Sequence, residues 1–112
     1  MDSTRMLKIS RLIQKELAEY FRETGKELGQ GSLISVTAVR ISPDLGQARV
    51  YLSIFPSAKA EPVVKDLESH VKTIRFELGK KIAKQVRHIP ELRFYIDDSM
   101  DYAERIDVLL KQ

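Results

Sequence analysis

The chain has 112 residues and a mass of 12.9 kDa, the size of one domain, and its 43% of hydrophobic residues can form a core. It contains no cysteine, which excludes disulfides, cysteine zinc sites and thiol catalysis. The net charge of +3 allows an anionic partner without requiring one. The apolar runs are too short for a membrane span or a secretion signal, so we expect a cytoplasmic protein with no membrane partner.

The first predicted element is an amphipathic helix from about Ser3 to Thr24. Apolar residues recur in it every three or four positions, and Ser3 or Thr4 can cap its first turn. Gly25, Gly29 and Gly31 are predicted to end this helix and to open a loop. The recurring apolar residues are Ile9, Leu12, Ile13, Leu17, Tyr20 and Phe21.

Two strands joined by a turn are predicted next, over residues 33–41 and 47–55. In the second strand the even-numbered residues from Ala48 to Ile54 are apolar and face one side, while the odd-numbered residues face the other. Between the strands, Pro43 restricts φ early in a five-residue connection, and Gly46 is free to take a positive φ near its end. This pattern predicts a β-hairpin.

A helical region is predicted to begin near Pro62 and to end before Pro90. Gly79 interrupts its apolar pattern, and a glycine inside a helix costs about 1 kcal/mol relative to alanine. We therefore expect two helices with a break at Gly79. The apolar residues at helical spacing are Val64, Leu67, Val71, Ile74, Leu78, Ile82 and Val86.

A third strand is predicted after Pro90, where Leu92, Phe94 and Ile96 alternate with more polar residues, and Ser99 can cap a short last helix. The order α-β-β-α-α-β with a C-terminal helix predicts an α+β fold. A hairpin followed by a helical crossover gives a three-stranded mixed sheet with helices on one face. The other face is expected to be open or partly covered by the last helix. No linker or repeat divides the chain, so residues 1–112 are interpreted as one domain.

The strongest local signal is a basic run over residues 72–88. Six lysines and arginines stand there against one acid, Glu77, while residues 89–112 carry six acids and three bases. Such polarity within a small chain predicts one surface that binds an anion and another that repels it. Arg75 lies near the apolar side of its predicted helix, where its stem can cover apolar surface.

Helical geometry places part of this basic run on one face. Lys80, Lys84 and Arg87 fall in one sector, flanked by Lys81 and His88. Many charged stripes are only solvated helix faces, but a one-sided run with so little acid favours phosphate binding.

The aromatic residues of the second strand leave two interpretations open. Tyr51 and Phe55, on the same face as Arg49, can form a platform on which bases stack. Aromatic residues on a sheet face more often pack, here under the last helix or against another protein.

No other group of residues predicts chemistry. His70 and His88 lack metal-ligand spacing, and the acids near the C-terminus lack the pattern of a calcium loop. No serine or threonine lies in a recognisable nucleophile setting. We therefore expect no catalytic residue, no metal and no cofactor.

The element order resembles a type II KH domain, a fold that commonly binds RNA, although the usual Gly-x-x-Gly between paired helices is absent. The chain also contains the segments RMLKISRLIQKEL (5–17), VRISPDLGQARVYLS (39–53), IRFELGK (74–80) and RHIPELRFYIDDS (87–99). These four segments resemble the ribosome-binding factor A family. Where this family often has Ala-x-Gly, the chain has His70-Val71-Lys72, which leaves Gly79 as the expected break.

This resemblance implies a ribosome biogenesis factor that is not an enzyme and needs no cofactor. Its partners would be the immature small (30S) ribosomal subunit and 16S rRNA, late in maturation when the rRNA ends are folded or processed. The resemblance also implies a link to growth in the cold and release by an assembly GTPase, and we expect a monomer when free. The expected RNA-binding residues are Lys72, Arg75, Lys80, Lys81, Lys84 and Arg87, with Arg40 and Arg49 from the hairpin.

The alternative is a protein-interaction adaptor. Its sheet face or acidic C-terminal helix would dock a ribosomal protein or the assembly GTPase. Adaptor binding would survive moderate salt and fail when Tyr51, Phe55 or the last helix is altered, whereas phosphate binding weakens steeply as salt rises.

Overall fold

A computed structural model describes residues 3–28 and 31–97 of the chain. The predicted helix after Ser99 lies outside these residues. Within these ranges, no helix is both long and apolar enough to cross a membrane. The elements in chain order are α1 (Ser3–Leu28), β1 (Leu33–Ile41), β2 (Gln47–Phe55), the short 3-10 helix η1 (Ser57–Lys59), α2 (Ala60–Ser69), α3 (Val71–Ile82) and β3 (Glu91–Ile96).

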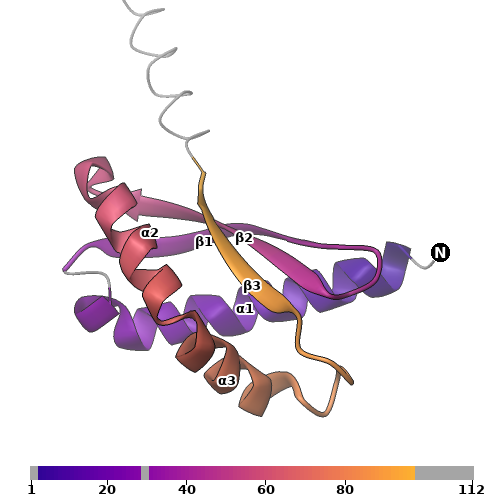
Figure 1. The fold of residues 1–112 in the computed structure, drawn as a ribbon. Coiled ribbons are helices and arrows are strands. Elements are labelled where there is room, and N and C mark those ends of the chain that lie inside the picture. Colours follow the sequence, from indigo (N-terminus) through magenta and orange to yellow (C-terminus); the bar gives the residue numbers. More distant parts are fainter. Residues whose placement is uncertain (1–2, 29–30, 98–112) are drawn as a thin grey trace, which may run out of the picture.

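The architecture is the predicted α+β arrangement. The sheet has the strand order β1-β2-β3, with β1 antiparallel and β3 parallel to β2. Helices α1, α2 and α3 lie on one side of this sheet, with α1 running beneath β1 and β2 (Figure 1). The parallel pairing of β3 requires the chain to cross over after the hairpin, and α2 and α3 make that crossover.

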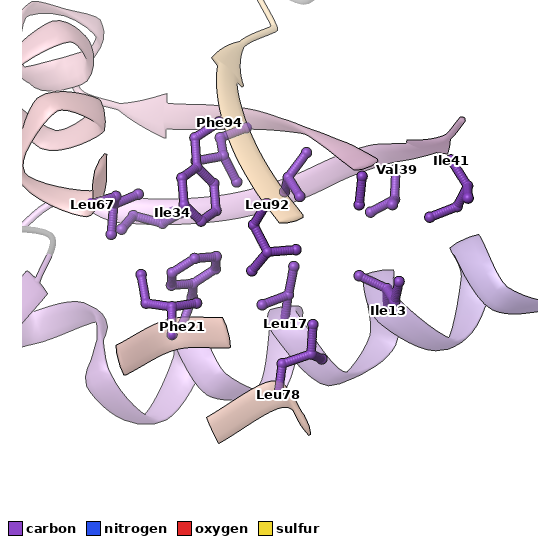
Figure 2. Packing of buried hydrophobic residues seen from close by; sticks show 14 of the residues in the cluster. Ile13, Leu17, Phe21, Ile34, Val39, Ile41, Leu67, Leu78, Leu92 and Phe94 are labelled. Carbon is purple, nitrogen blue, oxygen red and sulfur yellow. The ribbon is translucent and has the colours of Figure 1, made fainter. Parts of the chain in front are cut away.

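The core lies between α1 and the sheet, with α2 and α3 closing its side. Ile13, Leu17 and Phe21 point from successive turns of α1 toward the strands (Figure 2). The rings of Phe21 and Phe94 meet edge to face, with centroids 6.2 Å apart. Each fully buried aliphatic or aromatic side chain contributes about 1.5–3 kcal/mol, so this interface stabilises the fold more than any surface contact.

The hairpin has its predicted bounds, but its turn uses a different residue for the positive φ. Leu45, and not Gly46, takes φ 61°. The Asp44 carboxylate accepts hydrogen bonds from Ser42 Oγ at 2.6 Å and from the Gly46 amide at 3.0 Å, which closes the turn around it. A Cβ at Gly46 would lie 3.2 Å from an Asp44 carboxylate oxygen, so a larger residue here would require the Asp44 side chain to shift by a few tenths of an ångström.

Strand β1 contains a bulge, and the buried residues are even-numbered before it and odd-numbered after it. The register with β2 shifts between Val36 and Ala38, which leaves Thr37 as the extra residue. Ile34 before the bulge and Val39 after it are therefore both buried, although they differ in parity. Gln14 of α1 donates hydrogen bonds to the carbonyls of Val36 and Thr37, at 3.2 and 3.4 Å, which ties the helix to the bulge.

Two predicted helix ends are wrong. Helix α1 passes its predicted end near Thr24 and continues through Gly25 to Leu28, because a single glycine costs about 1 kcal/mol but keeps its backbone hydrogen-bonding groups. The break between α2 and α3 falls at His70, with φ −108° and ψ 13°, and Gly79 remains helical inside α3. The paired helices therefore meet where the family resemblance places its junction.

Side chains explain the break at His70. Ser69 Oγ donates to the Asp66 carbonyl at 2.6 Å, and His70 Nδ1 lies 2.9 Å from the same oxygen. The Asp66 carbonyl is thus satisfied by side chains where the next helical turn would have supplied a backbone amide. The His70 amide instead donates to the Leu67 carbonyl at 3.0 Å, which tightens the last turn of α2.

Candidate nucleic-acid interface

The basic run does not form one helix. Helix α3 ends at Ile82, and the amides of Gln85 and Val86 both donate to the Ile82 carbonyl, at 2.9 and 3.1 Å. Residues 83–90 then return the chain to the start of β3. The predicted helical sector of Lys80, Lys84 and Arg87 is therefore wrong, because only Lys80 belongs to α3.

The returning chain folds back beside α3 and encloses a surface hollow. The hollow has a volume of about 490 Å³ and collects cations from both sides, so we call it the basic hollow. Four of the eight predicted RNA-binding residues line it. Its lining residues are Lys72, Arg75, Phe76, Gly79, Lys80, Arg87, His88 and Ile89.

Gly79 shapes the floor of the basic hollow. A Cβ at this position would lie 3.4 Å from Ile89 Cγ1, at the limit of ordinary contact. The returning segment therefore packs directly against α3 at this position. The sequence predicted a helix break at Gly79. In the structure, Gly79 lies inside an intact helix, at a position where the returning segment approaches closely.

Arg75 holds the returning segment in place. Its Nε donates to the Pro90 carbonyl at 3.1 Å, and a terminal guanidinium nitrogen donates to the Ile89 carbonyl. The side chain is half-buried. Because charged donors make the stronger hydrogen bonds of proteins, this contact fixes the wall of the basic hollow, and it occupies part of the guanidinium that the sequence assigned to phosphate.

An exposed aromatic ring lies within the basic hollow. Phe76 has 64% of its surface exposed, and Lys80 Nζ lies 4.7 Å from its ring centroid. Lys80 also pairs with Glu77 at 3.4 Å on the exposed surface, where such a pair is weak. An open ring beside mobile cations can stack with a base or a sugar while the cations meet phosphates.

Phe76 was not among the site residues predicted from the sequence, although a signal for it was present. Ile74, Leu78 and Ile82 form the buried stripe of α3, and Phe76 lies off that stripe. An aromatic residue at a position where helical periodicity expects a polar one is a candidate for binding.

Comparison with known proteins gives the family. The family model for ribosome-binding factor A matches residues 5–110. The chain belongs to this family. A relative from Cytophaga hutchinsonii, named ribosome-binding factor A, is 44% identical over 112 residues, which cover 100% of this chain and 84% of the relative.

Two solved structures share the fold. The crystal structure of ribosome-binding factor A from Thermus thermophilus is similar with a TM-score of 0.69 and 22% identity, covering 81% of this chain and 94% of that one. The second is a homology model of the Thermus thermophilus factor, fitted into the cryo-EM map of a 30S complex with that factor. It has a TM-score of 0.52 and 21% identity, and covers 73% of this chain and 96% of that one.

In this member of the ribosome-binding factor A family, the other predicted RNA-binding residues lie outside the basic hollow. Lys81 Nζ lies 4.0 Å from Glu16 Oε2 of α1, on another side of α3. Lys84 is exposed in the turn that follows α3 and does not line the hollow. Arg40 and Arg49 are exposed on the sheet face that points away from the helices.

The two histidines lie in different settings. His70 forms the helix junction, and His88 lines the basic hollow. Among the residues that the structure describes, no group of three or more His, Cys, Asp or Glu could hold a metal ion. The chemistry of the basic hollow is therefore that of cations, an aromatic ring and backbone, which matches a polyanion better than a metal.

Proposed function

We propose that this chain acts as a single KH-like domain that binds the immature 30S ribosomal subunit through 16S rRNA. Membership of the ribosome-binding factor A family and the 30S complex of the Thermus thermophilus factor support this proposal. The observation that carries it is the basic hollow, where an exposed phenylalanine lies among cations from α3 and from residues 83–90.

Within the basic hollow, Lys72, Lys80 and Arg87 are the side chains that neutralise phosphates. Lysine supplies a compact charge and arginine a two-pronged donor, while Arg75 positions the wall. Phe76 adds a sequence-tolerant stacking surface. Three neutralised phosphates give a salt dependence with a log–log slope of about two to three.

The protein works by occupancy and not by bond chemistry. Binding the rRNA in one arrangement shifts the equilibrium between arrangements by the difference in affinity for the two. We propose that this happens late in maturation, at the folding or processing of the rRNA ends, and that it supports growth in the cold. We further propose that the free protein is a cytoplasmic monomer and that an assembly GTPase assists its release.

The test is co-sedimentation of the purified protein with immature and with mature 30S subunits across a salt series. The triple variant Lys72→Gln/Lys80→Gln/Arg87→Gln removes three positive charges from the basic hollow. The matched control, Lys8→Gln/Arg11→Gln/Lys15→Gln, removes three exposed positive charges from α1. Arg75 stays unchanged because its loss would disturb the wall of the hollow.

We expect wild-type protein and the α1 control to bind immature subunits in preference to mature ones, and binding to fall as salt rises. The hollow variant should bind weakly at every salt concentration and with a smaller salt slope. Binding that changes neither with salt nor in the hollow variant would favour the adaptor. An apolar surface for such an adaptor is present at one end of the β1–β2 ladder, where the paired residues Leu33 and Phe55 are both exposed. No association with either subunit would overturn the proposal.

A further inference from the structure

A row of three arginines crosses the sheet on the face opposite the helices. Arg40 of β1 is the register partner of Arg49 of β2, and Arg49 is the register partner of Arg93 of β3. Directly paired residues of adjacent strands project from the same face, so the three side chains stand side by side. We call them the arginine row; Arg93 has no part in the basic hollow.

The arginine row is exposed and uncompensated. All three side chains are exposed, and none of them forms an ion pair within residues 3–28 and 31–97. Like charges directly opposite one another destabilise a sheet. Glu91 is the partner of Gln47 at one end of the face, and Asp97 at the other end accepts a hydrogen bond from Thr37 Oγ1 at 2.6 Å. The acids therefore flank the row and do not neutralise it.

The next row on the same face is aromatic. Tyr51 of β2 and Tyr95 of β3 are register partners, and their rings stack with centroids 5.5 Å apart and planes 27° apart. Each tyrosine lies two residues from an arginine on its own strand, which is about 7 Å along the strand. We call these residues the tyrosine pair.

The face is also hollowed beside the arginine row. A depression of about 220 Å³ lies at the hairpin end, and its lining residues are Arg40, Ile41, Ser42, Pro43, Gln47 and Arg49. In the described part of the chain the helices lie on the other side of the sheet (Figure 1). Within the described residues, this sheet face therefore offers a ligand cations, stacked phenol rings and a shallow depression.

From this arrangement we infer that the outer sheet face is a second RNA-binding surface, specific for single-stranded RNA. The arginine row binds consecutive phosphates, and an unpaired base stacks on the tyrosine pair at the exposed ring of Tyr95. Guanidinium groups suit this role because their planar donors match phosphate oxygens. The inference rests on the proposed function for the class of ligand, but it concerns a different surface.

The combination of residues favours RNA over an acidic protein. An acidic peptide would satisfy the arginine row alone, whereas the adjacent tyrosine pair adds the stacking surface on which single strands are bound. A duplex offers no unstacked base to such a surface. Since the basic hollow lies on the helix side and the arginine row on the outer face, one molecule can hold two RNA segments at once.

The test measures fluorescence anisotropy of a labelled oligouridylate of about ten nucleotides, a length within the range that such surfaces accommodate. The variant Arg40→Gln/Arg49→Gln/Arg93→Gln removes the arginine row, and Lys8→Gln/Arg11→Gln/Lys15→Gln is the charge-matched control. We expect the row variant to lower the salt slope by about two, at about 0.7 for each phosphate contact of a single strand. Tyr51→Leu/Tyr95→Leu should weaken binding roughly ten-fold at every salt concentration.

A second readout locates the RNA. Photo-crosslinking with a 4-thiouridine oligonucleotide should label the peptides that contain Tyr51 or Tyr95, also in the hollow variant Lys72→Gln/Lys80→Gln/Arg87→Gln. Crosslinks confined to peptides of α3 and residues 83–90, or binding that the row variant leaves unchanged, would overturn the sheet-face inference while leaving the proposed function intact. Failure of the wild-type protein to bind the oligonucleotide at low salt would also overturn it. If sedimentation shows no 30S binding while the oligonucleotide still binds the sheet face, the result overturns the proposed function and not the sheet-face inference.

Discussion

The basic hollow and the arginine row both concentrate positive charge, but they are assembled differently. In the basic hollow, cations from α3 and from residues 83–90 meet only because the chain folds back against Gly79 and is held by Arg75. In the arginine row, ladder pairing alone aligns residues from three strands. A cationic surface can therefore be assembled by one tertiary contact or by sheet register. We expect mutations to affect the two surfaces differently.

The largest expected effect is at Arg75, which is one of the cations of the basic hollow and also holds its wall in place. Arg75→Met keeps an apolar stem but removes the donors to the Ile89 and Pro90 carbonyls. Since hydrogen bonds from charged groups contribute about 1.5–3 kcal/mol, we expect the free energy of unfolding to fall by about 2 kcal/mol. Urea denaturation measures it. Arg87→Met, on an exposed side chain, is the control and should change stability by less than about 0.5 kcal/mol. Equal stability of the two variants would contradict the role given to Arg75.

The next effect separates binding from stability within the basic hollow. Phe76→Ala should weaken binding to immature 30S subunits by about ten-fold, because stacking on one aromatic ring contributes about 1–3 kcal/mol. Its stability should hardly change, since the ring is 64% exposed. Quantitative sedimentation measures the affinity, and Phe76→Tyr should preserve it. Unchanged affinity in Phe76→Ala would mean that the hollow acts through charge alone.

A smaller effect of opposite sign is expected in the arginine row. Arg49 faces a like charge on both sides, so Arg49→Gln should raise the free energy of unfolding by about 0.5 kcal/mol at low salt. Arg40→Gln removes one of these repulsions and should give a smaller gain. The gains should vanish near 1 M salt, where the screening length is about 3 Å. Denaturation at both salt concentrations provides the measurement, and destabilisation by Arg49→Gln would show that the row is not under repulsion.

The smallest effect concerns the hairpin turn that sets the register of Arg40 and Arg49. Hydrogen bonds from Ser42 and then from the Gly46 amide lower the pKa of Asp44 below its ordinary value. A lowered folded-state pKa stabilises the protein above the unfolded pKa, near pH 4, and this stabilisation is lost as the pH falls through the folded-state pKa. Asp44→Asn should therefore have a slightly lower Tm than wild type at neutral pH, and the difference should shrink in acid. A difference that grows in acid would contradict this sign.

The sequence by itself determined the elements whose signals are local. Alternation in β2, the β-rich composition of residues 33–41 and the Pro43–Gly46 turn placed both hairpin strands at their observed bounds, and apolar spacing identified the buried face of α1. These signals predict the elements correctly because the periodic pattern depends only on which face of each element is buried. The family resemblance and the concentration of positive charge over residues 72–88 were likewise readable in the chain.

Only the tertiary structure decided where the helices break and which cations meet. Gly79 lies inside an intact helix with Ile89, ten positions later, packed beside it, and Arg75 donates to the carbonyls of Ile89 and Pro90, which are distant in the sequence. The arginine row was equally hidden, since Arg93 joins Arg40 and Arg49 only through the parallel register of β3. The physical reason is common to all of these: the partners are far apart in sequence, and no local period records them.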